Sequence, residues 1–207
     1  MLEATSEITT SSPCREEMAA SDFRGGRPTN LTFALRGVNH LALVCRNMAR
    51  TVEFYRDILG MPLVKTVELP FGQGQHFFFD IGNGDCLAFF WFASAPEPIE
   101  GVVTPTALPG DGNFVTAIGS MNHVAFDVAP EHFDQYRQRL IERGVRLSPV
   151  MNHDDSELTV ASELYPGVYV RSMYFRDPDG ILLEFAAWTR QLGEADVRAD
   201  PAITSGA

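Results

Sequence analysis

The chain has 207 residues, of which 45% are hydrophobic, 11% aromatic and 21% charged, so it is long enough to bury a core of ordinary globular composition. Its net charge is −11, and its fifteen arginines and one lysine form no cluster, which argues against a nucleic-acid or anionic-membrane partner. No apolar run could span a bilayer, no secretory signal is evident, and the three cysteines lack metal-ligand spacing, so we expect a cytoplasmic protein.

Residues 1–35 are rich in Ser, Thr, Gly and Pro, which predicts a flexible N-terminal tail. The segment 37–45 alternates apolar and polar residues as a half-buried strand does. Residues 48–60 carry an apolar stripe at helical spacing and end in Gly60, which predicts a helix. Three further strands are predicted at 62–69, 75–82 and 85–92, so the first module, 36–92, has the order βαβββ.

Residues 93–119 are rich in Pro and Gly and predict an inter-module linker or a functional loop. The βαβββ pattern then returns in a second module, residues 120–190, before a C-terminal tail, 191–207. Its predicted elements are a strand at 121–128, a helix at 130–145, and strands at 146–150, 168–175 and 181–188. The two modules repeat at a period of about 83 residues, so the chain is built from two copies of one supersecondary unit.

Each module opens with an Asn-His pair, Asn39-His40 in the first and Asn122-His123 in the second. Equivalent strand positions converge if the two modules pair about a pseudo-twofold axis. Glu184 lies in an otherwise apolar strand of the second module, where a buried carboxylate requires a compensating partner. Two imidazoles and one carboxylate are the ligands of non-haem Fe(II) oxygenases, and they also suit Mn(II). We therefore predict a metal site formed by His40, His123 and Glu184.

The position that matches Glu184 in the first module is Ala88 or Phe89, and neither residue can bind a metal. The predicted site therefore has three protein ligands and keeps open positions for substrate, water or O2. The alternative for Glu184 is a solvent-facing position or a pair with an arginine such as Arg171.

These residues resemble the vicinal oxygen chelate superfamily, which includes glyoxalase, bleomycin-resistance and extradiol dioxygenase proteins. The resemblance covers residues 37–188 and includes the two strand openings, the helix end FYRDILG (54–60) and the turn DPDG (177–180) before Glu184. It implies an α+β fold in which two βαβββ modules form a curved mixed sheet around a metal-binding cleft. Many members are homodimers, so a homodimer is an expected assembly.

The number of ligands separates the reactions of this superfamily. Glyoxalases and methylmalonyl-type epimerases generally use four protein ligands, whereas extradiol dioxygenases and fosfomycin-resistance transferases use His, His and Glu. The transferases are shorter and exchange modules between chains, which fits a fused two-module chain less well. Residues 173–184 resemble the second half of the extradiol signature, and the resemblance implies a catalytic role for Tyr174 in hydrogen-bonding a substrate hydroxyl.

The acid–base histidines of extradiol enzymes are missing, because Tyr165 and Asp85 stand at the matching positions. His76 and His153 are the candidates to replace them.

The expected function is that of a divalent-metal enzyme, extradiol-dioxygenase-like, with Fe(II) as the first expectation and Mn(II) as the second. Its partner would be a small substrate, aromatic or otherwise carrying vicinal oxygens. Two alternatives stay open. One is a metal-dependent lyase, isomerase or transferase that does not use O2, and the other is a non-catalytic protein that binds a drug or metabolite.

Overall fold

The computed structural model describes residues 35–202, so nearly all of the expected N-terminal tail and residues 203–207 lie outside the described residues. Both modules belong to one compact unit, Asn30–Arg190. The chain from Gln191 onward belongs to a separate unit, whose described part contains the 3₁₀ turn η4 (Glu194–Asp196). No helix in the described range combines the length and the apolar character that a membrane crossing needs.

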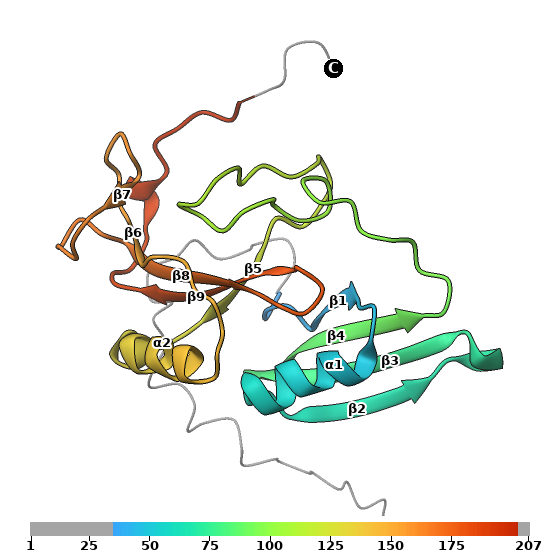
Figure 1. Cartoon of the computed structure of the whole chain (residues 1–207). Coiled ribbons are helices and arrows are strands. Elements are labelled where there is room, and N and C mark those ends of the chain that lie inside the picture. Colours follow the sequence, from blue (N-terminus) through green and yellow to red (C-terminus); the bar gives the residue numbers. More distant parts are fainter. Residues whose placement is uncertain (1–34, 203–207) are drawn as a thin grey trace, which may run out of the picture. The chain divides into compact units, whose positions relative to one another are not determined.

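The first module follows the predicted order of elements (Figure 1). It consists of β1 (His40–Val44), α1 (Met48–Val52), the π-helical η1 (Glu53–Ile58), β2 (Leu63–Glu68), the 3₁₀ turn η2 (Pro70–Gly72), β3 (Gly74–Gly82) and β4 (Asp85–Phe92). The strands form a four-stranded mixed sheet in the order β1-β4-β3-β2, in which β1 is parallel to β4 and the other pairs are antiparallel.

The predicted helix of the first module forms because Asn47 caps its N-terminus, accepting a hydrogen bond from the backbone N–H of Arg50. Its second half widens into the π-helical η1. This turns Tyr55 fully into the core, where its ring packs against Phe79 and Phe89 of the sheet.

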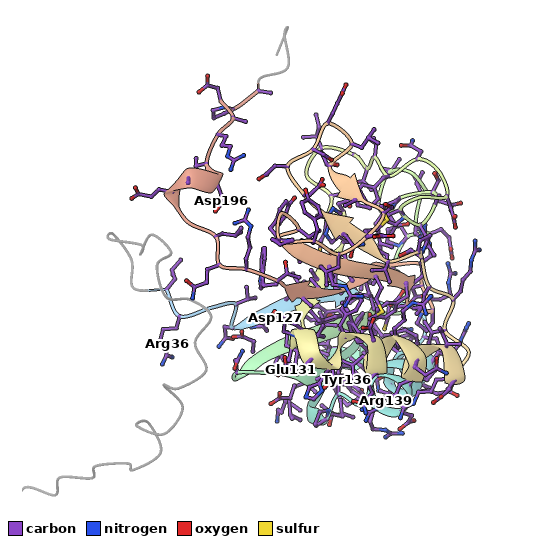
Figure 2. The ribbon with its side chains drawn as sticks, turned by 90° about the vertical axis from the view of Figure 1, so that its left-hand side faces the viewer. Arg36, Asp127, Glu131, Tyr136, Arg139 and Asp196 are labelled. Atoms are coloured by element: carbon purple, nitrogen blue, oxygen red, sulfur yellow. The ribbon has the colours of Figure 1, made fainter. Side chains whose placement is uncertain are left out.

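The second module consists of β5 (Val124–Asp127), the 3₁₀ turn η3 (Pro130–His132), α2 (Phe133–Glu142), β6 (Met151–His153), β7 (Val160–Ala161), β8 (Val170–Arg176) and β9 (Leu182–Trp188). Its five-stranded mixed sheet has the order β5-β9-β8-β6-β7. Tyr136 of α2 packs edge-on against Phe185 of β9, so α2 covers one face of this sheet (Figures 1 and 2). Two mixed sheets with few helices confirm the predicted α+β class.

The strand predicted at 146–150 is wrong, because pairing with β8 begins at Met151, just after the last residue of the predicted strand. Before that point Ser148 makes a single backbone bond, from its N–H to the Tyr174 carbonyl (2.9 Å). Pro149 follows without an N–H and interrupts the ladder. The shift matters for function, because the strand that does form ends at His153.

Several polar contacts connect the modules, among them a bond from the Arg143 guanidinium to the Ile58 carbonyl and two bonds to the turn before β9. The Tyr55 hydroxyl donates to Asp177 Oδ2 (3.2 Å), and the Arg46 backbone N–H donates to Asp179 Oδ2 (3.0 Å). Both acceptors lie in the predicted turn between β8 and β9, so this turn rests against the first module.

Candidate metal centre

The second module brings three of the four sequence-predicted site residues together. Glu184 lies on β9, directly opposite Tyr174 on β8, and His123 immediately precedes β5 on the other side of β9. The His123 Nε2 and Glu184 Oε2 atoms are 3.0 Å apart. The His123 and Tyr174 rings meet edge to face with their centroids 5.7 Å apart.

The orientation of His123 is fixed by the residue before it. Its Nδ1 lies 2.8 Å from the Asn122 side-chain oxygen. Because a carbonyl oxygen can only accept, Nδ1 carries a ring proton, and Nε2 is directed at Glu184. A proton on Nε2 makes this 3.0 Å contact a hydrogen-bonded ion pair, and a divalent cation in place of that proton would make both atoms its ligands. Ligand bonds of about 2.1 Å place neighbouring donor atoms about this far apart, so the pair fits a divalent metal.

Glu184 is only 5% exposed. Burial acts to raise the pKa of its carboxyl group, but the hydrogen bond with His123, the nearby Ser172 hydroxyl and the His123 and His153 rings together outweigh burial, and the pKa lies below its ordinary value. The Ser172 hydroxyl next to it is fully buried and has no hydrogen-bond partner of normal geometry within residues 35–202. A fixed carboxylate beside an unsatisfied hydroxyl is a polar site suited to an exogenous group.

Tyr174 is held from both sides. Its backbone N–H donates to the Ser148 hydroxyl (3.0 Å), and its own hydroxyl lies 3.5 Å from His153 Nε2. Burial first, and the Glu184 carboxylate second, raise the pKa of the Tyr174 hydroxyl. The group is therefore a proton-bearing hydrogen-bond donor at neutral pH, which suits a substrate oxygen next to the metal ligands.

His153 belongs to this centre, although the sequence alone left its position open. Burial lowers the pKa of its ring, while Glu184 and the backbone of Thr159 act in the opposite direction, so the imidazole is neutral near pH 7. Thr159 has a left-handed φ of 59°, which is strained for a β-branched residue. Its carbonyl accepts from the Asp154 N–H (3.2 Å), closing the loop that follows His153.

The inter-module linker also contributes to the centre. The Phe114 ring lies 5.8 Å from that of His123 and 6.2 Å from that of Tyr174, centroid to centroid. Leu108 packs with Tyr174 and Leu182 in a small apolar cluster. No motif marked Phe114, because it lies in an irregular Pro- and Gly-rich stretch whose path depends on tertiary contacts.

The fourth predicted residue, His40, is not brought to the other three within this chain. Among residues 35–202 no three His, Cys, Asp or Glu side chains gather closely enough to hold a metal ion. His40 is exposed on the first sheet, next to Phe78 (5.7 Å between centroids). The His76 ring stacks on the Phe90 ring of the same sheet, with 3.6 Å between centroids. His76 therefore lies on the first sheet, whereas Tyr174 lies on the second.

Strand register makes the two Asn-His pairs equivalent. His40 Nδ1 lies 2.8 Å from the Asn39 side-chain oxygen, as His123 does from Asn122. Ala88 occupies the position of Glu184, because Ala88 pairs with Ala42 and Phe78 as Glu184 pairs with Ala125 and Tyr174. The register therefore selects Ala88 over Phe89, and it sets Phe78 opposite as the counterpart of Tyr174.

Comparison with known proteins agrees with this architecture. Residues 37–185 match the family described as Glyoxalase/Bleomycin resistance protein/Dioxygenase superfamily. Metallothiol transferase FosB of Shouchella clausii is 27% identical over 151 residues, covering 72% of this chain and 79% of its own. Glyoxylase I 4 of Arabidopsis thaliana is 27% identical over 161 residues, covering 77% and 72%.

A solved glyoxalase family protein from Enterococcus faecalis has the same fold, with a TM-score of 0.52, 23% identity and coverage of 74% of this chain and 99% of its own. The family match spans both modules and includes His40, His123 and Glu184. The chain belongs to the glyoxalase/bleomycin resistance protein/dioxygenase superfamily, the vicinal oxygen chelate proteins.

Proposed function

We propose that this protein is a divalent-metal enzyme that chelates vicinal oxygens of a small substrate, with His40, His123 and Glu184 as its metal ligands. One observation carries the proposal: the Nε2 atom of His123, whose ring is held by Asn122, lies 3.0 Å from the buried Glu184 carboxylate, a separation that suits two ligands of one divalent cation. A bound divalent metal would supply Lewis-acid polarisation of the substrate oxygens.

The third ligand comes from a second copy of the chain. His40 has the same side-chain anchor as His123, but its own module offers Ala88 where a carboxylate would stand. Conversely, in the described part of the chain no third His, Cys, Asp or Glu lies close enough to complete a metal site with the His123 and Glu184 pair. In a homodimer that places His40 of one copy next to His123 and Glu184 of the other, the His–Glu pair gains a third ligand and His40 gains a metal to bind. The sequence favours a site within one fused chain over modules shared between chains. Under this proposal, sharing of modules between two chains is the expected assembly.

Tyr174 and His153 handle protons in this proposal. The neutral Tyr174 hydroxyl donates a hydrogen bond to a substrate oxygen, and the neutral His153 imidazole, 3.5 Å away, can accept a proton through it. His153 therefore fills the role for which the sequence offered no histidine at the family position.

The finer proposal is extradiol-type dioxygenation of a small aromatic substrate with Fe(II). Its support is the acid–base pair of Tyr174 and His153, together with the aromatic wall that Phe114 provides for a substrate ring. A second candidate is non-oxidative transfer or lyase chemistry, with Mn(II) as a suitable ion. The names of the two curated relatives, a metallothiol transferase and a glyoxylase, favour this candidate.

Metal analysis of the purified full chain tests the proposal. We expect about one Fe, Mn or another divalent ion per chain in the wild type, and a loss of affinity beyond about 100-fold in Glu184→Gln, because a ligand costs more than an outer-shell partner. Glu131→Gln, at an exposed carboxylate (Figure 2), is the matched control and keeps the metal. Equal metal content in Glu184→Gln and the wild type would contradict the site.

Oxygen uptake separates the two reaction classes. The Fe(II)-loaded protein, supplied with a panel of catechols, should consume O2 if the finer proposal holds. Transfer of a thiol to an acceptor substrate in the absence of O2, without any catechol-dependent uptake, would instead favour the second candidate.

A further inference from the structure

A second site lies away from the metal centre. A cavity of about 610 Å³ is enclosed by four segments of the Asn30–Arg190 unit: the first helix, the inter-module linker, the residues after α2 and the turn after β8. Its volume is that of an ordinary small-molecule pocket. None of His123, Tyr174 and Glu184 lines it.

The cavity gathers positive charge in an otherwise acidic chain. Four of its lining residues are arginines, from three of the four segments: Arg50, Arg143, Arg146 and Arg176. One of them, Arg146, is neutralised by Asp111 at 3.1 Å.

The other three guanidinium groups have no carboxylate partner among the described residues. Arg176 donates to the backbone carbonyls of Gly180 (2.8 Å) and Pro105 (2.5 Å), and Arg143 donates to the carbonyl of Ile58. Bonds to carbonyls orient these groups without cancelling their charge. The Arg50 guanidinium makes neither a hydrogen bond nor an ion pair within residues 35–202.

The acidic lining residues cancel only part of this charge. Asp177 directs its oxygens to the Tyr55 hydroxyl and to the backbone N–H groups of Asp179 and Ile181. Glu53 is the remaining carboxylate of the wall. Hydrogen bonds from neutral donors leave the charge of Asp177 in place, so three unpaired guanidinium groups against two carboxylates leave the cavity with an excess of positive charge.

The rest of the wall is apolar. It includes the buried side chains of Phe54 and Leu108 and the partly buried Ile58 and Val145. A hydrophobic floor with convergent cationic groups suits a ligand that has one apolar end and one anionic end.

We propose that this cavity binds a small organic anion, with an anionic head group among Arg50, Arg143 and Arg176 and an apolar body against Phe54 and Leu108. The head group is a carboxylate or a phosphate ester, since guanidinium groups pair with both.

Calorimetric titration of the metal-free full chain tests this site with four probes. Benzoate and phenyl phosphate carry the two head groups, benzyl alcohol lacks the charge, and inorganic phosphate lacks the apolar body. We expect saturable binding of benzoate or phenyl phosphate, with the tighter of the two identifying the head group. Inorganic phosphate should bind more weakly, and benzyl alcohol should not saturate. The bound probe should shift the amide resonances of Ala107 and Gly144, which line the cavity.

Substitutions of the lining arginines test whether the probes bind in this cavity. Arg50→Gln should weaken binding about tenfold, the value of one charged hydrogen bond, and the substitution keeps the backbone N–H that Asn47 caps while removing a guanidinium that makes no bond within residues 35–202. Arg143→Gln should act in the same direction. Arg139→Gln on α2 (Figure 2) is the matched control, and it keeps the affinity, as does Glu184→Gln. Unchanged binding in both cavity variants, equal binding of benzyl alcohol or inorganic phosphate, or no saturable binding of either organic anion would overturn the proposal.

Discussion

Asp177 opens the turn between β8 and β9, where its Oδ1 accepts hydrogen bonds from the backbone N–H groups of Asp179 (2.9 Å) and Ile181 (2.8 Å). Its Oδ2 accepts from the Tyr55 hydroxyl of the other module. Burial nevertheless dominates and raises the pKa of Asp177 to about 6, above the model-peptide value of 3.8. A carboxyl group whose pKa is higher in the folded state favours folding when it is protonated.

The protein should therefore lose stability at this residue as the pH rises from about 4 to 6, by up to roughly 3 kcal/mol. In Asp177→Asn the group no longer titrates, so the difference in unfolding free energy between wild type and variant should fall across that range. Urea unfolding at pH 4, 5, 6 and 7 measures it. In Tyr55→Phe the fall should extend to higher pH, because the lost hydrogen bond was lowering the pKa of Asp177. A difference that stays flat between pH 4 and 7 would refute this assignment.

Among the elements, β3 depends on its first residue. Gly74 lies opposite Phe92 of β4, and a Cβ built there would fall 1.9 Å from the Trp91 carbonyl oxygen. Backbone atoms cannot move aside as a flexible side chain can, so only glycine lets β3 and β4 meet at this end. The same strand pair carries the face on which His76 stacks with Phe90.

Gly74→Ala should consequently lower the free energy of unfolding by about 1–3 kcal/mol, the usual cost of overpacking. Chemical denaturation followed by tryptophan fluorescence measures the loss. Gly193→Ala is the comparison, because Gly193 has an ordinary negative φ and open space around its Cα. That variant should remain within about 0.5 kcal/mol of the wild type. Similar losses in both variants would contradict the proposed clash.

The elements were predictable where one local rule decided them. Short runs rich in aromatic and apolar residues located β3 and β4, and Asp177 to Gly180 located the turn before β9. The prediction failed at 146–150, where Pro149 interrupted an apolar stretch that otherwise reads as a strand.

The candidate centre was predictable only in part. The repeat pointed to His123, because equivalent positions in a duplicated module share an environment, and a carboxylate within an apolar strand pointed to Glu184. Phe114 and His153 were not assignable, since each lies beside irregular chain whose direction is set by contacts distant in sequence. The location of His40 could not be foreseen either, because the sequence does not say whether equivalent positions meet within one chain or between two.

At the scale of the whole molecule, the two modules are equivalent in backbone but not in chemistry. The second module carries His123, Glu184 and Tyr174, and the corresponding positions of the first are His40, Ala88 and Phe78. Each chain therefore offers one chelating half and one half whose matching positions supply a single imidazole, His40, beside Ala88 and Phe78. Under the proposed dimer, every metal site combines one half of each kind and keeps open positions for substrate.

Mixed dimers test this arrangement directly. Two chains with different affinity tags, one carrying His40→Ala and the other Glu184→Gln, are co-expressed, and dimers with both tags are isolated. Each variant alone should bind almost no metal. The mixed dimer should hold about half the metal of the wild type, because one of its two sites then receives an intact His40, His123 and Glu184. The matched control pairs the wild-type chain with a chain that carries both substitutions. Sites shared between chains predict almost no metal in that control, since each of its sites lacks one ligand, whereas sites within a chain predict half and would leave the first mixed dimer empty.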